Sequence, residues 1–232
     1  MKKVGFNTGV MYKTIYPISN KMLDICFKIA PEHLEVSCHS MKEMGDLSKL
    51  HIRKLLKFGS LSIHAPCHGI RYGNNKETRL VFNEIEKLSQ KVKIENVVFH
   101  PDLIDDVIIF ERCEFTKSVE NMDWRKERYK NTEELAEFFE KTDFKFTLDI
   151  NHVFTNDKTL KLANELVEHF GERLIEVHIS GFETFHEPIF VTKQDQIIQK
   201  VKKLEVPFVI ESTCASQGEM KKEFEYIKER LK

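Results

Sequence analysis

Short apolar runs alternate along the chain with longer segments in which apolar residues recur every three or four positions. The short runs are rich in Val, Ile, Leu and Phe and have the length of β-strands. The longer segments keep charged residues on the opposite face, which is typical of surface helices. Helices are expected at residues 76–92, 132–142, 158–171, 194–204 and 219–231, among others. Strands are expected at residues 3–7, 33–37, 61–65, 96–100, 118–121, 144–150, 174–180 and 207–213.

Eight strands that alternate with helices over 232 residues predict a single (β/α)8 TIM barrel that spans residues 1–232. No stretch rich in Ser, Gly or Pro divides the chain into domains. A doubly wound open sheet is the alternative, but it usually needs fewer strands. Only residues 101–113 separate His100 from Glu114. The helix after the fourth strand is therefore expected to be short.

The balance of charges excludes one class of nucleic-acid-binding protein. The chain has 36 Lys and Arg against 37 Asp and Glu, a net charge of −1. This excludes a polybasic protein that binds nucleic acid through its overall charge, although a local basic patch is still allowed. The sequence shows neither an apolar run of membrane-spanning length nor the apolar block of a signal peptide. The five cysteines include no CxxC pair. Together these features predict a cytoplasmic protein with free thiols and no membrane partner.

Polar residues end six of the eight predicted strands. In a TIM barrel the carboxyl ends of the strands form the rim of the active site. Side chains alternate along a strand, and in each case the preceding residue is apolar and faces the helices. The polar residues are therefore expected to point toward the barrel axis; they are His64, His100, Glu120, Asp149, His178 and Glu211.

A ring of imidazoles and carboxylates would be costly to bury without compensation. One such histidine alone is more simply explained as a hydrogen-bonded rim residue. Six at the same strand position favour one or two divalent metal ions. The mixed nitrogen and oxygen donors suit zinc first, with manganese or iron as alternatives, whereas calcium would take oxygen ligands only. His152 and His186 lie close enough in sequence to extend the ring.

The motifs SIHAP, VVFHP, ENM, LDINH, VHIS, HEPI and IES, in this order, resemble the xylose isomerase-like TIM-barrel superfamily. Within it they are most similar to the endonuclease IV branch. The resemblance implies that His64, His100 and Glu120 hold one metal. It also implies that Glu120 bridges to a second metal, whose other ligands are Asp149, His178 and Glu211.

The same resemblance implies a third zinc site at His152 and His186. In endonuclease IV an aspartate completes that site, but Thr184 stands at its position here. Two neutral donors fall short of the three protein ligands that a catalytic zinc normally has. The third site is therefore predicted to be weak or empty, unless Glu183 or Glu187 reaches it.

Two catalytic interpretations remain open. The first is endonuclease IV-like hydrolysis of a phosphoester or phosphodiester, in a phosphorylated sugar or abasic nucleic acid, by two metals. The second, implied by the isomerase and epimerase branch, is a sugar or sugar-phosphate isomerase with one metal and Glu120 and Glu211 as acid and base. The additional pair His64 and His100 favours the hydrolase. A barrel that binds metal and ligand without turnover is a third possibility.

Two loops above the predicted rim combine cations with aromatic rings. Arginine binds phosphate oxygens and aromatic faces stack on bases or sugars. Residues 122–130 carry four basic and two acidic side chains, although a solvated helix start would have the same composition. Cys67, three residues after His64, is interpreted as a free loop thiol. The expected substrate contacts are Arg71, Tyr72, Trp124, Arg125 and Arg128.

Overall fold

The computed structural model of the chain describes residues 2–232, and its strands form one closed parallel barrel. Each strand pairs with the next along the chain, and β8 pairs with β1. The prediction of a (β/α)8 barrel is confirmed. The strands are β1 (Val4–Asn7), β2 (His33–Ser37), β3 (Leu61–His64), β4 (Asn96–Phe99), β5 (Lys117–Glu120), β6 (Lys145–Asp149), β7 (Leu174–Ile179) and β8 (Phe208–Ile210).

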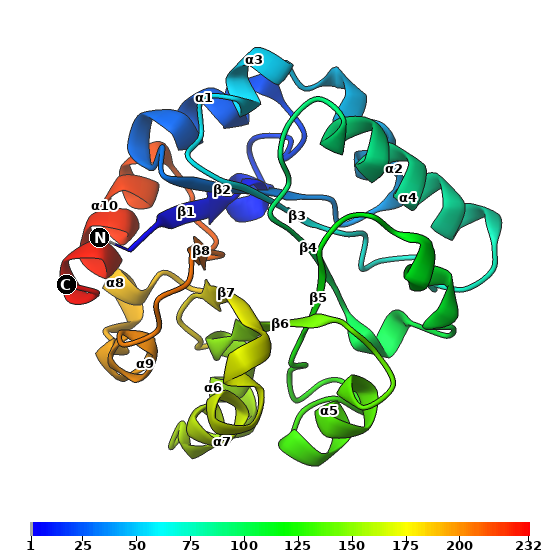
Figure 1. Cartoon of the computed structure of the whole chain (residues 1–232). Helices are drawn as coiled ribbons and strands as arrows, with labels where there is room; N and C mark the ends of the chain where they lie inside the picture. Colours follow the sequence, from blue (N-terminus) through cyan, green and yellow to red (C-terminus); the bar gives the residue numbers. More distant parts are fainter. Residues whose placement is uncertain (1) are drawn as a thin grey trace.

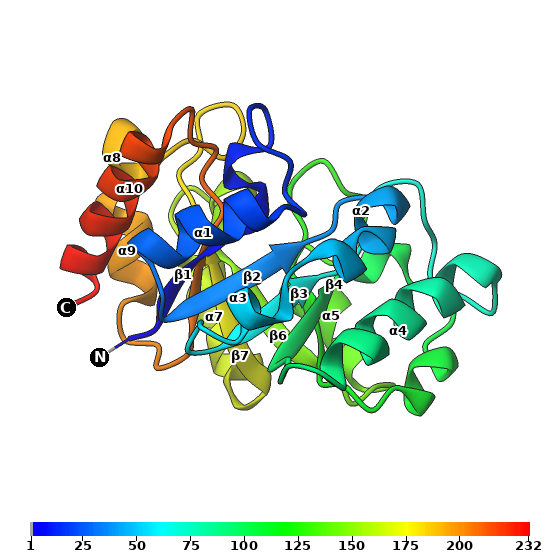
Figure 2. The same ribbon diagram turned by 90° about the horizontal axis from the view of Figure 1, so that it is seen from above.

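Helices surround the barrel, and the two ends of the chain lie beside the last helix in both views (Figures 1 and 2). The helices are α1 (Asn20–Ile29), α2 (Met41–Gly45), α3 (Ile52–Leu55), α4 (Lys76–Ser89), α5 (Thr132–Phe139), α6 (Ile150–Asn156), α7 (Lys161–Phe170), α8 (Ile189–Thr192), α9 (Asp195–Val201) and α10 (Gln217–Arg230). Among the described residues, no helix combines the length and the apolar character that crossing a membrane requires.

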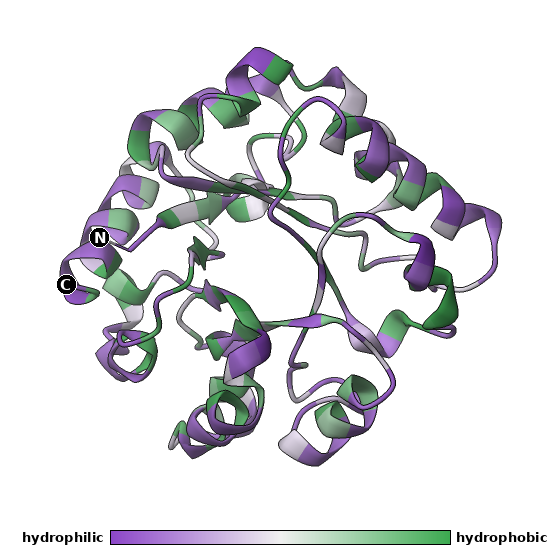
Figure 3. Cartoon of the chain, viewed as in Figure 1, coloured by the Kyte–Doolittle hydropathy of each residue, from purple (hydrophilic) through white to green (hydrophobic). Residues whose placement is uncertain are grey.

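The longer helices form for reasons that are visible in the sequence. Four of them begin after a side chain that accepts a hydrogen bond from the first turn: Ser19, Asn75, Asn131 and Ser216. Hydrophilic and hydrophobic residues alternate around these helices (Figure 3). The apolar residues pack against the outer face of the barrel.

The connection between β4 and β5 differs from the others. Within the described chain it contains two short 3-10 turns, Pro101–Leu103 and Ile108–Arg112, and no α-helix. Phe110 fills the missing layer, with its ring centroid 5.0 Å from those of Phe99 and Phe144. The expected short fourth helix is therefore replaced by two 3-10 turns and an aromatic cluster.

Tyr72 belongs to this aromatic cluster, which corrects its predicted role as a substrate contact. Its side chain is fully buried, and its ring centroid lies 5.0 Å from that of Phe99. Its hydroxyl donates to the Pro66 carbonyl at 2.7 Å. The ring fills the space above the short β4–β5 connection, so it is turned into the core and cannot reach a ligand.

The interior of the barrel below the rim is polar. TIM-barrel interiors are usually filled by branched apolar side chains. Here the Oγ atoms of Ser118 and Thr147 lie 2.7 Å apart, and Asn96 donates to Thr147 at 3.4 Å. His33, Glu35 and Glu176 are also buried. The polar rim therefore rests on a second polar layer.

Candidate metal centre

Three adjacent strand ends bring together a carboxylate, a second carboxylate and an imidazole. Glu120 and Asp149 are the last residues of β5 and β6, and His178 is the penultimate residue of β7. One ligand atom from each lies within 4.8 Å of the others, and all three residues are buried. Glu211 follows β8 directly, and its Oε1 lies 3.4 Å from His178 Nδ1. The four residues expected to surround one metal converge on the barrel axis.

The donor atoms of this group fit a divalent cation. Glu120 Oε2, Asp149 Oδ2 and His178 Nδ1 are buried, and within residues 2–232 they have no hydrogen-bond partner. A buried polar atom without a partner costs about 1–3 kcal/mol. Two carboxylate oxygens and an imidazole nitrogen are ligands that zinc, manganese and iron all accept. A single bound ion would compensate all three atoms at once.

Asp149 is oriented by its local structure. Its Oδ1 accepts the backbone N–H of His152 at 2.9 Å and so caps α6. Asn121 fixes the backbone on either side, because it donates to the Asp149 carbonyl and accepts from the Asp149 N–H, each at 2.9 Å. These bonds leave Oδ2 directed toward the centre.

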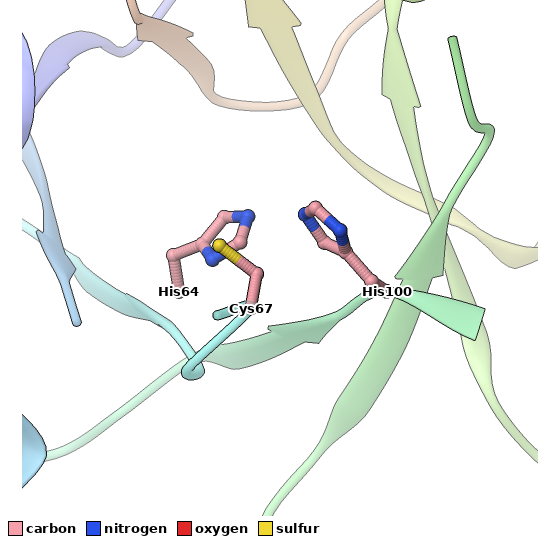
Figure 4. A group of neighbouring side chains, drawn as sticks. All are labelled: His64, Cys67 and His100. Carbon is pink, nitrogen blue, oxygen red and sulfur yellow. The ribbon is translucent and has the colours of Figure 1, made fainter. Parts of the chain in front are cut away.

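A second ligand group lies on the other side of Glu120. Ligand atoms of His64, Cys67 and His100 lie within 4.8 Å of one another, and Figure 4 shows the three side chains converging. Glu120 Oε1 lies 2.7 Å from His100 Nε2 and 3.8 Å from His64 Nε2. Its other oxygen, Oε2, lies 3.2 Å from His178 Nδ1. Glu120 thus presents one oxygen to each group.

Burial and the neighbouring imidazoles act in opposite directions on the pKa values of the three carboxylic acids. Burial raises the pKa of Glu120, but His100 and the neighbouring imidazoles outweigh it and hold that pKa well below its usual range. Burial raises the pKa of Asp149, and it raises the pKa of Glu211 to about 8. The neighbouring imidazoles thus favour the ionised form of Glu120, whereas burial disfavours the ionised forms of Asp149 and Glu211. A divalent ion would supply the missing positive charge.

Residues beneath the rim orient His178. Its Nε2 lies 3.2 Å from Glu35 Oε2 and 3.3 Å from Glu176 Oε1, and these contacts orient the ring with Nδ1 toward the centre. Glu176 Oε2 in turn lies 3.2 Å from His33 Nε2. Asn7 donates to Glu35 at 2.7 Å and to Glu211 at 3.1 Å, which joins this layer to the rim.

The sequence interpretation missed Asn7, His33, Glu35 and Glu176. The signal was available, because alternation places Glu35 with His33, and Glu176 with His178, on the inward face of their strands. His33, Glu35 and Glu176 lie further into the barrel than the strand ends, whereas Asn7 is the last residue of β1.

The residues of the proposed third site do not assemble as a ligand group. The rings of His152 and His186 lie 6.0 Å apart between centroids. None of the candidate ligand groups found among residues 2–232 includes either histidine. Glu187 accepts from the backbone N–H groups of its own loop, at residues 183–185. The prediction that this site is weak or empty still awaits a metal measurement.

The cations of the rim loops are paired with carboxylates. Arg71 binds Asp105 in an exposed pair. Arg125 binds the buried Asp123 and stacks on Phe185, with its guanidinium carbon 5.6 Å from the ring centroid. Lys126 forms an ion pair with Asp102 at 2.7 Å, and Arg128 forms one with Glu137 of α5 at 2.9 Å. The Trp124 side chain is 59% exposed.

Comparisons with known proteins identify the fold. Neither a protein-family model nor a curated protein matches the sequence. Solved structures match over nearly the whole length. The probable 3-DHS dehydratase AsbF from Bacillus anthracis superposes with a TM-score of 0.71 at 12% identity, covering 98% of this chain and 99% of that one. At this identity the similarity shows the (β/α)8 barrel fold.

Two further structures with this fold have different activities in their names. Endonuclease IV from Thermus thermophilus matches with a TM-score of 0.65 and 15% identity, over 99% of this chain and 98% of that one. D-psicose 3-epimerase from Clostridium cellulolyticum matches with a TM-score of 0.65 and 12% identity, over 99% of both chains. At these identities the similarity establishes the barrel and leaves the reaction open.

The two ligand groups predict two metal equivalents per chain. Equilibrium dialysis with zinc, followed by elemental analysis, should give about two equivalents for the wild type. His64→Ala and His100→Ala should each lower this by about one, because either change removes a ligand from the second group only. His169→Ala, at an exposed position on α7, is the matched control. Unaltered metal content in both rim variants would mean that the centre holds a single ion.

The contact between Glu176 and His178 predicts an effect on metal affinity without loss of a ligand. Glu176→Gln removes a negative charge that faces Nε2, so zinc affinity should fall by roughly 10–100-fold while the saturating stoichiometry stays the same. A competition titration with a chromophoric chelator measures this change. Glu172→Gln, at an exposed position, is the control. Equal affinities for both variants would show that Glu176 does not support the ligand.

Proposed function

We propose that this protein is a two-metal phosphoester or phosphodiester hydrolase that acts on a phosphorylated sugar or on abasic nucleic acid. The observation that carries the proposal is the position of Glu120. One of its oxygens faces His64 and His100, and the other faces His178. A carboxylate shared between two ligand groups could hold two ions a few ångströms apart, the separation that two-metal phosphoryl-transfer sites use.

The residues would divide the work as follows. Two bound ions would supply Lewis-acid stabilisation of the phosphoryl oxygens and would lower the pKa of a water molecule. His64 and His100 would hold one ion, Asp149, His178 and Glu211 the other, and Glu120 would bridge them. Asn7 keeps Glu211 in place by donating to its Oε1 at 3.1 Å. Arg125 would bind a phosphate oxygen at the rim.

The isomerase or epimerase is the second candidate, and one observation favours it. Glu120 Oε2 and Glu211 Oε1 lie 3.2 and 3.4 Å from the same atom, His178 Nδ1. Two glutamates on either side of one ligand could serve as the acid and base that move a proton between neighbouring carbons. This reaction gives no role to His64 and His100, which is why we place it second.

A substrate panel separates the candidates. Zinc-loaded protein is incubated with a duplex that contains an abasic site, with sugar phosphates, and with unphosphorylated ketoses in D2O. We expect strand cleavage or phosphate release, reduced at least about 100-fold in Glu120→Gln. Deuterium incorporation into a sugar without phosphate release would reject the hydrolase in favour of the epimerase. The absence of turnover on every substrate would instead support a binding protein.

The rim loop predicts a specific contact with the phosphate. Arg125→Ala should raise KM for the phosphorylated substrate by about tenfold, the scale of one charge-assisted contact, with little change in metal content. Arg112→Ala, at an exposed position that precedes β5 at the other end of the barrel, is the matched control. Steady-state kinetics at two salt concentrations measure both variants, since a phosphate contact weakens as salt rises. The same KM for Arg125→Ala and the wild type would remove the loop from the binding site.

A further inference from the structure

The loop after β3 holds Cys67 at a defined place on the rim. The backbone N–H groups of Cys67 and His68 both donate to the His39 carbonyl, at 3.3 and 3.0 Å. On the other side of Cys67, the buried Tyr72 hydroxyl donates to the Pro66 carbonyl at 2.7 Å. These bonds tie the loop to the ends of β2 and β3. The thiol is thus placed by the fold and does not hang from a free loop.

Two imidazoles share the space that Cys67 faces. The sulfur and one nitrogen from each of His64 and His100 all lie within 4.8 Å of one another (Figure 4). His64 Nδ1 lies 3.0 Å from the Ala65 carbonyl, to which only a ring N–H can donate, and its Nε2 lies 3.8 Å from Glu120 Oε1. His100 Nε2 faces Glu120 Oε1 at 2.7 Å. One sulfur and two nitrogens therefore surround a common volume, and a Glu120 oxygen contacts the nitrogen of His100.

We propose that Cys67 is a thiolate ligand of the ion held by His64 and His100, and that this half of the centre selects a thiophilic ion such as zinc. The inference rests on the second ion of the proposed function and adds a ligand and a metal preference to it. Zinc takes Cys and His ligands in tetrahedral sites, whereas magnesium and manganese prefer oxygen. On binding, the S–H bond breaks, its proton passes to solvent, and the sulfur electron pair is donated to the ion without change of oxidation state.

The two halves of the centre would then differ in chemistry. Glu120, Asp149 and His178 offer two oxygens and one nitrogen, a harder donor set than that of His64, Cys67 and His100. The softness of the ligands, more than the overall affinity, decides which metal each half takes. A mixed-metal centre, with zinc on the cysteine side, follows from this asymmetry.

Cobalt spectroscopy tests the proposal directly. Metal-free protein is titrated with Co²⁺, which gives a near-ultraviolet charge-transfer band only when a thiolate is a ligand. We expect the band to accompany one of two bound equivalents in the wild type. It should be absent in Cys67→Ala and Cys67→Ser. Cys113→Ala, at a half-buried thiol that precedes β5 at the opposite end of the barrel, should keep it. Circular dichroism confirms that each variant is folded.

The outcomes separate this inference from the proposed function. Two bound equivalents without a charge-transfer band, or a band that persists in Cys67→Ala, would reject Cys67 as a ligand and leave the two-metal hydrolase standing. A single equivalent that gives no band would reject both. In competition with manganese, Cys67→Ala should lose more than about tenfold of the zinc preference, since even outer-shell changes reach that size. An unchanged preference would overturn the selectivity.

Discussion

The cost of burying carboxylates along the barrel axis determines the arrangement of the site. Glu35, Glu120, Asp149 and Glu176 are all buried, and Glu211 stands beside them with little exposure. An ionised carboxylate in such surroundings must be paired or must coordinate a metal. Imidazoles in β2, β3 and β7, together with His100 directly after β4, pair with some of these carboxylates. Some donor atoms at the rim still have no hydrogen-bond partner, and a divalent ion would compensate them.

His178 connects the two polar layers. Its Nε2 faces the two glutamates below the rim, and its Nδ1 faces Glu120 and Glu211 at the rim. A change in the lower layer would therefore alter the ligand without touching a substrate. This coupling accounts for a barrel interior that is polar where most barrels of this kind are apolar.

The segments that connect the strands determine which side chains surround the rim. The β4–β5 connection is reduced to 3-10 turns, and the aromatic cluster of Phe99, Phe110 and Tyr72 seals the barrel behind it. The β3–β4 connection holds the Cys67 thiol beside His64 and His100. The loop after β5 has a positive local charge, but three of its cations already form ion pairs with carboxylates. They are Arg125, Lys126 and Arg128. The phosphate contact that we propose there would have to displace these acidic partners, and it would be sensitive to salt.

The period of the apolar residues determined the barrel, because eight short runs separated by amphipathic segments have one common solution in a chain of this length. The same alternation determined that His64, His100, Glu120, Asp149 and His178 share the inner face. Contacts between residues distant in the chain were decided only by tertiary structure. Tyr72 looks like a loop aromatic in the sequence and is a core residue, because the missing fourth helix leaves a space that it fills. Cys67 looks like a free loop thiol in the sequence. It lies beside His64 and His100 because the loop after β3 is hydrogen-bonded to the His39 carbonyl. Hydrophobic periodicity is local and can be read along the chain, whereas the partner of a polar atom depends on the closure of the barrel.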